Sequence, residues 1–288
     1  MSHFPVLRDE ALEYLAIRPE GTYLDATAGL GGHTGEIARR LTTGKVIASD
    51  RDAESLAIAR QNTLDATVKI QFIHATFSTL ADVLAEAEFG KVDGLLADLG
   101  VSRFQLTEAP RGFSFMTDGP LDMRMDQSRG ATASDLVNRS AEKALADWIH
   151  QLGGERRARK IARAIVRSRP IRSTLHLAGV VERAVPRTGR LHPATLTFQA
   201  LRMVVNSEQD ELDRLLEIAP RLVHGGGRIV MISFMSLEDG KVKRKFREWE
   251  KDGVGKILTK RPIEPSEEET RSNPPSRSAK LRAFEVVG

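Results

Sequence analysis

The sequence predicts an α/β protein with a Rossmann-like, doubly wound and mostly parallel sheet, interrupted by an inserted α-helical domain. Between residues 22 and 98, short apolar strands alternate with amphipathic segments of helical length, which is typical of βαβ units. The alternation stops near residue 105 and resumes near residue 195, and only helical patterns fill the interval. We therefore expect a sheet domain in two parts, residues 1–105 and 195–288, with a helical domain at 106–194.

The first part supplies most of the expected sheet. Leu7, Ala11 and Leu15 have helical spacing and predict an amphipathic helix near the N-terminus. A glycine-rich turn over residues 29–33 leads into a helix that ends at Gly44. The expected strands are residues 22–26, 45–50, 70–74 and 92–98.

The insertion and the last part are expected to contain longer helices. In the insertion, Ser140 can cap a helix that ends near Gly153, and further helices run to Pro170 and over residues 175–185. One long helix is expected from Phe198 to Ala219, followed by a strand at 228–234. Strands near 257–259 and 280–287 are expected to pair antiparallel at the sheet edge, and 265–278 is expected to be a polar loop.

The composition is that of an ordinary globular protein. Of 288 residues, 41% are hydrophobic and 28% are charged, values unlike those of disordered or membrane proteins. The absence of cysteine excludes disulfides, thiolate nucleophiles and cysteine-ligated zinc. No apolar run approaches the roughly 20 residues that span a bilayer, and residues 1–15 lack a signal-peptide core. We expect a cytoplasmic protein without a membrane partner.

Basic residues are concentrated in two segments although the net charge is only +4. Such clusters suit a phosphate backbone because neutralising each phosphate releases condensed counterions. A solvated basic helix face is an equal alternative for either cluster taken alone. The first cluster comprises Arg156, Arg157, Arg159, Lys160, Arg163, Arg167, Arg169 and Arg172, and the second Lys241, Lys243, Arg244, Lys245 and Arg247.

A nucleotide-cofactor site is predicted at the carboxyl ends of the first two strands. The glycine turn lets a ligand approach the backbone closely, and open α/β sheets bind ligands at this edge. Asp50 ends the second strand, where a carboxylate can accept both hydroxyls of a ribose. A dinucleotide fingerprint needs a third glycine where Thr34 stands. Asp25 suits the ammonium of a methionine moiety and would repel a pyrophosphate, so S-adenosylmethionine is favoured over a nicotinamide dinucleotide.

Two further residues follow the third and fourth strands. Phe77 is placed to stack on or flank the adenine, with a core phenylalanine as an equal alternative. Asp98 ends the fourth strand and is expected to face the crevice between cofactor and substrate, with a turn or helix cap as the alternative. The segment 99–102 is not an obvious helix, which favours the functional interpretation of Asp98.

These residues belong to motifs through which the chain resembles the ribosomal RNA small-subunit methyltransferase H family, also called the MraW type. The resemblance runs essentially from end to end, and its most specific stretch is Asp118–Asp126. Other matching segments are 3–7, 25–33, 50–52, 77–78, 98–106, 111–115, 154–156, 161–165, 192–195, 198–202, 205–206, 233–239, 273–274, 277–278 and 281–282.

The resemblance implies a cytoplasmic enzyme with the fold of class I S-adenosylmethionine methyltransferases. Its implied reaction is methylation of N4 of one cytosine in the decoding region of 16S rRNA, so its partners would be 16S rRNA and the small ribosomal subunit. No metal is implied. The oligomeric state stays open, with a homodimer as one alternative. The implied cofactor contacts are Gly31, Gly32, His33, Asp50, Phe77, Asp98 and Gln105.

The chain departs from the family pattern on the expected substrate side. Arg103, Phe104 and Thr107 stand around Gln105 where the family has a serine, a proline and an acidic residue. Met235 replaces a histidine, and Leu196 replaces a basic residue. These positions lie outside the implied cofactor contacts.

Asp98 is the expected catalytic residue, because an acceptor for the amine hydrogens would localise the lone pair of a cytosine amine. Backbone carbonyls of residues 99–102 are the alternative. The target base must leave its stack. Extended residues 118–126 would put Leu121, Met123 and Met125 against the pocket wall and their charged neighbours toward RNA, with a buried edge strand as the alternative. The first basic cluster would grip the RNA backbone.

Rival functions stay open at this point. One is methylation of a different nucleic-acid amine, such as adenine N6 or the N4 of a DNA cytosine; the basic clusters argue against a small-molecule substrate. Another is a cofactor-gated RNA-binding assembly factor without enzymatic activity.

Overall fold

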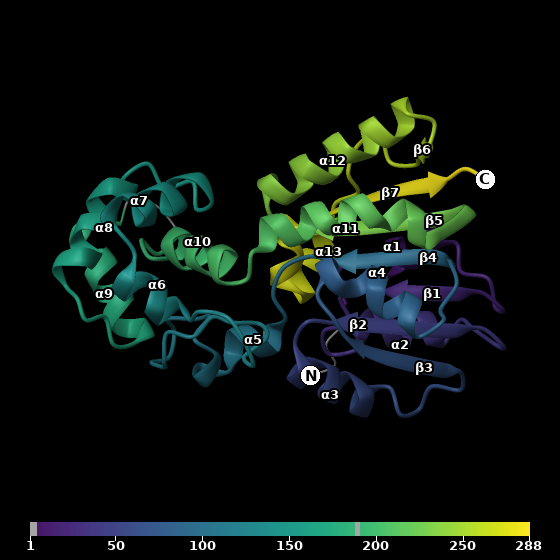
Figure 1. Ribbon diagram of the computed structural model, residues 1–288, viewed down its shortest axis with the longest axis horizontal. Helices are drawn as coiled ribbons and strands as arrows, with labels where there is room; N and C mark the ends of the chain where they lie inside the picture. Colours follow the sequence, from purple (N-terminus) through teal and green to yellow (C-terminus); the bar gives the residue numbers. More distant parts are fainter. Residues whose placement is uncertain (1–4, 188–190) are drawn as a thin grey trace. The chain divides into compact units, whose positions relative to one another are not determined.

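A computed structural model describes residues 5–187 and 191–288 and gives the elements shown in Figure 1. The chain divides into two compact units, one formed by the residues up to Gly100 with Asp210–Gly288, the other by Val101–Gln209. The expected boundaries, 106 and 194, differ from these. The second differs because α10 (Thr195–Val205) packs against α6 (Ala133–Arg139) and α7 (Glu142–Gln151) of the second unit.

The first unit is built on a seven-stranded, mostly parallel sheet with the order β3-β2-β1-β4-β5-β7-β6. β1 to β5 pair in parallel, whereas β7 is antiparallel to both β5 and β6. The expected doubly wound sheet with an antiparallel edge is confirmed. The strands are β1 (Thr22–Asp25), β2 (Lys45–Asp50), β3 (Lys69–His74), β4 (Val92–Asp98), β5 (Val223–Ser233), β6 (Gly255–Ile257) and β7 (Lys280–Val286).

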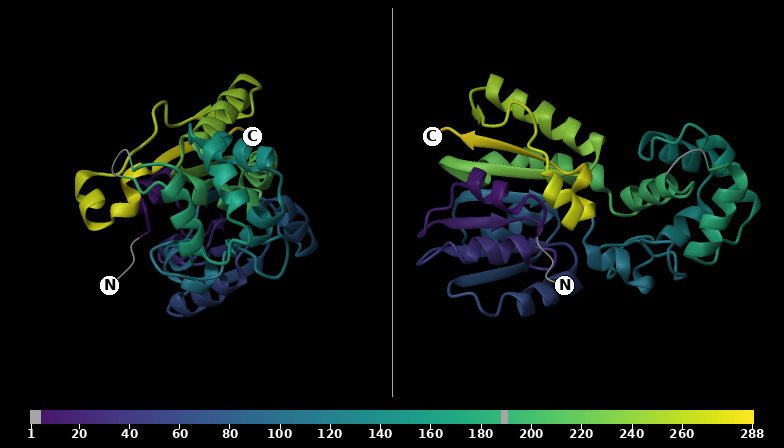
Figure 2. Two further views of the ribbon diagram at one scale, coloured as in Figure 1. Left: turned by 90° about the vertical axis from the view of Figure 1, so that its left-hand side faces the viewer. Right: turned by 180° about the vertical axis from the view of Figure 1, so that it is seen from behind.

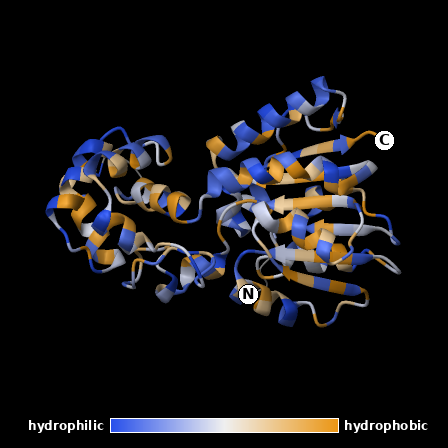
Figure 3. Ribbon diagram, in the orientation of Figure 1, coloured by the Kyte–Doolittle hydropathy of each residue, from blue (hydrophilic) through white to orange (hydrophobic). Residues whose placement is uncertain are grey.

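Helices cover both faces of this sheet. Figure 1 shows α4 (Phe77–Glu86), α11 (Glu208–Leu222) and α12 (Ser236–Lys251) on the near face. The reverse view in Figure 2 shows α1 (Arg8–Leu15) and α2 (Gly32–Ala38) on the other face, which α3 (Ala53–Asn62) also covers. Because both faces are covered, consecutive strand residues are apolar: Leu95 packs into one apolar cluster and Leu96 into the other. Figure 3 shows the hydrophobic central strands beside a largely hydrophilic α12.

The described part of the second unit contains helices and loops but no strand. Its core is a single apolar cluster that includes Leu145, Ile161, Leu177 and Phe198. Helix α8 (Ala158–Arg167) is strongly amphipathic: Ile161 and Ile165 are buried, and its exposed residues are basic. The helices are α5 (Arg103–Thr107), a 3-10 turn η1 (Ala109–Arg111), α6, α7, α8 (Ala158–Arg167), α9 (Thr174–Ala184) and α10.

Three sequence-based expectations about local structure were wrong. The long helix from Phe198 to Ala219 is two helices, because Ser207 has a left-handed backbone with φ 48° between α10 and α11. The expected loop at 265–278 contains α13 (Glu267–Ser272), which Ser266 caps, and a 3-10 turn η2 (Pro274–Ser278). Ser140 ends α6 instead of capping α7.

Membrane insertion finds no support in the helices. Within residues 5–187 and 191–288, none is both long and apolar enough to cross a bilayer.

Candidate active site at the carboxyl edge of the sheet

Three aspartates end neighbouring parallel strands at one edge of the first unit. Asp50 ends β2, Asp25 ends β1 and Asp98 ends β4. Pairing of Asp25 with Ala48 on β2 and with Leu96 on β4 fixes β1 between the other two strands. This is the edge at which open α/β sheets bind ligands.

The loop between β1 and α2 requires glycine at its centre. Gly31 has φ 88°, and a Cβ there would lie 3.2 Å from the Cα of Ala59 on α3. The side chain of Asn62 donates to the carbonyl of Leu30 at 2.9 Å, which ties the loop to α3. Gly32 starts α2, and a Cβ there would come within 3.3 Å of the Pro5 side chain. The two glycines therefore allow the loop to pack closely against α3 and Pro5, and they carry no side chains at this edge.

Asp50 holds this loop from the neighbouring strand. Its Oδ2 accepts a hydrogen bond from the backbone nitrogen of Gly29 at 2.8 Å, and its Oδ1 accepts one from that of Asp52 at 2.9 Å. Burial raises the pKa of Asp50 to about 6, and the two hydrogen bonds oppose the rise. Each carboxylate oxygen has two lone pairs, so the group can still accept ribose hydroxyls.

Asp25 is completely buried beneath the loop. Its Oδ2 accepts a hydrogen bond from Thr34 Oγ1 at 2.6 Å, and its Oδ1 accepts one from the backbone nitrogen of Thr27 at 3.1 Å. Burial raises the pKa of Asp25. Thr34, which stands where a dinucleotide-binding turn would have glycine, therefore serves as a partner of this carboxylate.

His33 and Asp98 face each other across the site. Nε2 of His33 lies 3.7 Å from Oδ2 of Asp98, with side chains 5% and 24% exposed. Among the described residues, neither ring nitrogen of His33 nor the buried Oδ1 of Asp98 has a hydrogen-bond partner. Burial lowers the pKa of His33, but Asp98 and Asp25 outweigh it, and the net pKa is raised. Thr27 Oγ1 accepts a hydrogen bond of 2.6 Å from the backbone nitrogen of Asp98 and fixes its position.

Phe77 begins α4, directly after the end of β3. Its ring is partly buried and packs against the apolar cluster of that face. The backbone nitrogen and the hydroxyl of Ser78 donate to the Glu211 carboxylate at 2.9 and 2.8 Å, which anchors the start of α4 to α11. Phe77 therefore has a core contact and lies at the same sheet edge as the aspartates.

Gln105 belongs to the second unit and not to the residues gathered at the sheet edge. It is 4% exposed, and its Oε1 accepts from the backbone nitrogen of Ser102 at 3.0 Å. The hydroxyl of Ser102 accepts in return from the backbone nitrogen of Gln105 at 3.2 Å. This capping box fixes the start of α5. A cofactor contact of Gln105 stays a prediction.

The Asp118–Asp126 segment is a tightly held loop in the second unit. Leu121, Met123 and Met125 are buried in its core, as the alternation predicted, but Met123 has φ 61° and the segment is not a strand. Asn206 donates to the carbonyl of Met123 at 2.7 Å and accepts from the backbone nitrogen of Met125 at 2.8 Å. Asp122 and Arg124 form a bidentate pair with each other, at 2.7 and 2.9 Å.

The first basic cluster separates into structural and unpaired side chains. Arg169 donates to the carbonyls of Val137 and Ser140 at the end of α6, and Arg157 lies 3.4 Å from Glu155. Arg163 lies 3.5 Å from Glu142. The exposed members with no side-chain partner in the described part of the chain are Arg156, Arg159, Lys160, Arg167 and Arg172.

The second basic cluster separates in the same way. On α12, Lys241 pairs with Asp213 at 2.6 Å and Lys245 with Glu248 at 2.7 Å. Lys243, Arg244 and Arg247 are exposed, without such partners within the described ranges.

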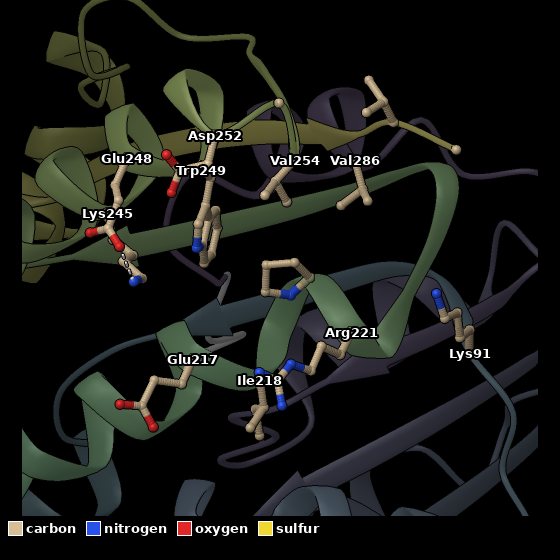
Figure 4. Close-up of a pocket in the computed structure, with 14 residues that line it drawn as sticks. Lys91, Glu217, Ile218, Arg221, Lys245, Glu248, Trp249, Asp252, Val254 and Val286 are labelled. Carbon is tan, nitrogen blue, oxygen red and sulfur yellow. Dashed lines mark hydrogen bonds and ion pairs between the residues drawn. The ribbon is translucent and has the colours of Figure 1, made fainter.

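A pocket of about 890 Å³ lies elsewhere in the first unit (Figure 4). Residues of α11 and α12 line it, with Lys91 just before β4 and Gly288 at the end of the chain. It therefore lies at the amino end of β4, whereas Asp98 stands at the carboxyl end. Charges of both signs, such as Arg221 and Glu248, line this pocket, and Trp249 packs into the core beneath it.

Comparison with known proteins agrees with this geometry. The model of the MraW methylase family matches residues 1–287. The chain belongs to the MraW methylase family. It is 66% identical over 99% of both chains to the "Ribosomal RNA small subunit methyltransferase H" of Solibacter usitatus, and 50% identical over 98% of both to that of Acidobacterium capsulatum. A solved structure titled "Crystal Structure of PH0851" has a TM-score of 0.51 at 13% identity, covering 100% of this chain and 47% of that one, and supports the fold.

The departures from the MraW pattern fall on defined structural positions. Met235 precedes α12, where Glu238 accepts hydrogen bonds from the backbone nitrogens of Phe234 and Met235, both at 3.1 Å. Because these are backbone contacts, the loop keeps its anchor without the histidine. Arg103 is exposed at the start of α5, and the Phe104 ring lies 5.9 Å from the guanidinium of Arg111. His3, where the motif resemblance begins, lies outside the described residues.

Sequence reasoning missed the residues that support the MraW site from a distance. Thr27 and Thr34 hold Asp98 and Asp25, and Glu269 on α13 accepts a hydrogen bond from the backbone nitrogen of Leu7 at 2.9 Å. Ser266 followed by acidic residues is a helix-start signal from which α13 could have been predicted. No local pattern predicts the contact with Leu7, which is 262 residues away in the sequence.

Proposed function

We propose that the protein is an S-adenosylmethionine-dependent methyltransferase that methylates N4 of a cytosine in the decoding region of 16S rRNA. Membership of the MraW methylase family and the printed names of the relatives support ribosomal RNA of the small subunit as the substrate. The family resemblance of the motifs supports the cytosine and its position. The observation that carries the chemistry is Asp98, a partly exposed carboxylate beside the glycine loop with a buried oxygen that lacks a partner among the described residues.

The residues at the sheet edge fit S-adenosylmethionine. The loop at Gly31 and Gly32 would approach the cofactor with its backbone, Asp50 would accept the ribose hydroxyls, and Phe77 would flank the adenine. His33 and Asp98 bring polar atoms that still need partners, and the family resemblance implies a further cofactor contact from Gln105. When bound, S-adenosylmethionine would supply an electrophilic methyl group to the amine nitrogen of the substrate.

The task of Asp98 follows from the chemistry of the amine. The lone pair of a cytosine amine is delocalised into the ring and is a poor nucleophile. A carboxylate that accepts a hydrogen bond from this amine localises the lone pair and aims it. Much of the acceleration would then be positioning, which can supply roughly 7–11 kcal/mol for well-oriented pairs. The backbone carbonyls of residues 99–102 are the other candidate acceptors.

The second unit would bind the RNA around the target base. A base reaches a pocket of this kind only after it leaves its stack. Contacts to phosphates orient the RNA, and the unpaired cations on and beside α8 are the residues that can make them. Arg157 and Arg169, which hold the fold of this unit, are not needed for that role.

The test is methyl transfer by the purified protein, from labelled S-adenosylmethionine to naked 16S rRNA and to small ribosomal subunits. Mass spectrometry then maps the methylated nucleotide, and rRNA from cells lacking the protein should be unmethylated at the same position. The Asp98→Asn variant should lose transfer and still bind S-adenosylhomocysteine in calorimetry. The Asp93→Asn variant, which changes a carboxylate near the other end of β4, is the matched control.

The outcomes separate the alternatives. Methyl transfer to an adenine or to DNA would show that the substrate is not the proposed cytosine. Specific RNA binding without any methyl transfer would favour an assembly factor. Full activity of Asp98→Asn would remove Asp98 from the mechanism. No affinity for S-adenosylmethionine or its demethylated product would refute the proposal as a whole.

A further inference from the structure

We propose that His33 is a positioning residue that holds the Asp98 side chain in the correct orientation to accept a hydrogen bond from the amine of the substrate. This inference rests on the proposed function and assigns a side-chain role to a residue whose backbone already belongs to the cofactor loop. Its basis is the pairing of a buried imidazole with an aspartate at this edge that remains partly accessible. Nε2 of His33 faces Oδ2 of Asp98 at 3.7 Å.

Burial distinguishes the two members of this pair. The His33 side chain is 5% exposed, whereas that of Asp98 is 24% exposed. A substrate can therefore reach Asp98 but not the imidazole behind it. Buried polar groups are almost always hydrogen-bonded. The buried nitrogens of His33, which lack partners among the described residues, therefore indicate a functional role. Among the residues that the structure describes, Asp98 is the acidic group that forms an ion pair with His33.

The surroundings of His33 favour its protonated form. Carboxylates face it from four elements: Asp98 on β4, Asp25 on β1, Glu36 on α2 and Glu269 on α13. The charge of Glu36 is partly offset by Arg39 at 2.8 Å and Arg40 at 3.4 Å. Asp25 and Glu269 accept hydrogen bonds from neutral partners and keep their negative field. The imidazole therefore sits in a net negative environment, which agrees with its raised pKa.

An imidazolium in this place has a defined effect on the reaction. Its positive charge attracts the carboxylate of Asp98, and it restricts the rotation of the carboxylate through a charge-assisted contact. The backbone hydrogen bond from Asp98 to Thr27 fixes the main chain at the same point. Together they hold the acceptor in one position while a base enters.

The first test uses single-turnover methyl transfer between pH 5 and 9 with His33→Gln and His33→Phe. The neutral glutamine should lower the rate at pH 7 by about tenfold, which corresponds to roughly 1.4 kcal/mol of lost positioning. The pH–rate profile should also change, because the titrating imidazole of His33 is replaced by a side chain that carries no charge. His224→Gln, on an exposed histidine near the amino end of β5, is the matched control and should change neither.

The second test needs neither cofactor nor substrate. The seven histidines are labelled, and the His33 imidazole is titrated by NMR in the cofactor-free wild-type and Asp98→Asn proteins. If the Asp98 carboxylate interacts with His33 as proposed, the pKa of His33 should be lower in Asp98→Asn than in the wild-type protein. This measurement stands even if the His33 variants do not fold.

The results distinguish this inference from the proposed function. If Asp98→Asn loses transfer while His33→Gln keeps the wild-type rate and profile, and the His33 titration is identical in both proteins, only the role of His33 is overturned. Loss of cofactor affinity in His33→Gln without a shifted profile would also overturn it, because His33 would then serve the cofactor alone. Full activity of Asp98→Asn would remove the premise that both share.

Discussion

The carboxylate of Asp50, at the end of β2, accepts a 2.8 Å hydrogen bond from the backbone nitrogen of Gly29 in the loop that follows β1. The contact joins two strands at the point where the cofactor ribose is proposed to bind. One group thereby shapes the glycine loop and offers its remaining lone pairs to a ligand. Its protonation state should consequently control cofactor affinity.

Cofactor affinity should fall below pH 6. Because the pKa of Asp50 is raised to about 6, this carboxylate becomes protonated below pH 6. The protonated group can no longer accept hydrogen bonds from both ribose hydroxyls. S-adenosylhomocysteine should bind about tenfold more weakly at pH 5 than at pH 7.5, since each pH unit below the pKa lowers the ionised fraction tenfold. Calorimetry across this range measures the slope. Asp50→Asn should bind weakly at every pH, and an unchanged slope in that variant would assign the effect to another group.

Gly31→Ala should destabilise the protein more than Gly226→Ala does. Both glycines have similar left-handed backbones, φ 88° and 82°, but a Cβ at Gly31 meets Ala59 at 3.2 Å, whereas Gly226 has nothing within 4 Å. Both variants carry the roughly 1–2 kcal/mol of left-handed strain, and Gly31→Ala adds overpacking of about 1–3 kcal/mol. Thermal unfolding of the two variants gives the difference. Equal losses of stability in the two variants would contradict this prediction and would mean that α3 shifts to accommodate the new methyl group.

Asp25→Asn should stabilise the cofactor-free protein at neutral pH. Burial raises the pKa of Asp25, so the folded protein holds this proton more tightly than the unfolded chain. That contribution to stability is present at low pH and is lost as the pH rises through the folded pKa. The melting temperature of the variant should therefore fall less than that of the wild type as the pH rises from about 4, the ordinary pKa of an aspartate, to 8. Asp82→Asn, an exposed position on α4, is the control, and a variant less stable at pH 8 would contradict the prediction.

Charge reversal on α8 should weaken RNA binding without affecting the cofactor. Arg159 and Arg167 are exposed and lack partners in the described structure, so Arg159→Glu with Arg167→Glu leaves two phosphates of the RNA without a cation and removes little folding energy. The slope of log affinity against log salt should decrease by roughly 0.7–0.9 for each phosphate that the protein no longer neutralises. Arg214→Glu on α11 reverses a charge that is paired with Glu217 at 2.9 Å. The α8 assignment fails if both proteins show the same slope.

Much of the fold was predictable because helices and strands have local periods. The apolar runs of β1, β2 and β4 and the helical spacing of α1 and α8 require only neighbours in sequence. The motifs also identified the end of each strand that carries a ligand-binding residue, because parallel strands share one carboxyl edge. The break between α10 and α11 was missed because one left-handed residue, Ser207, interrupts an otherwise continuous helical pattern.

The sequence by itself determined the sheet, the glycine loop and the three aspartates at the strand ends, since each follows from local pattern and strand direction. Only the tertiary structure decided which polar groups meet: His33 with Asp98, Thr34 with Asp25, and Glu269 with Leu7. It also decided which arginines hold helix ends and which stay unpaired. Such pairings depend on distances between elements far apart in the chain, and these distances are set by packing against both faces of the sheet and not by any local pattern.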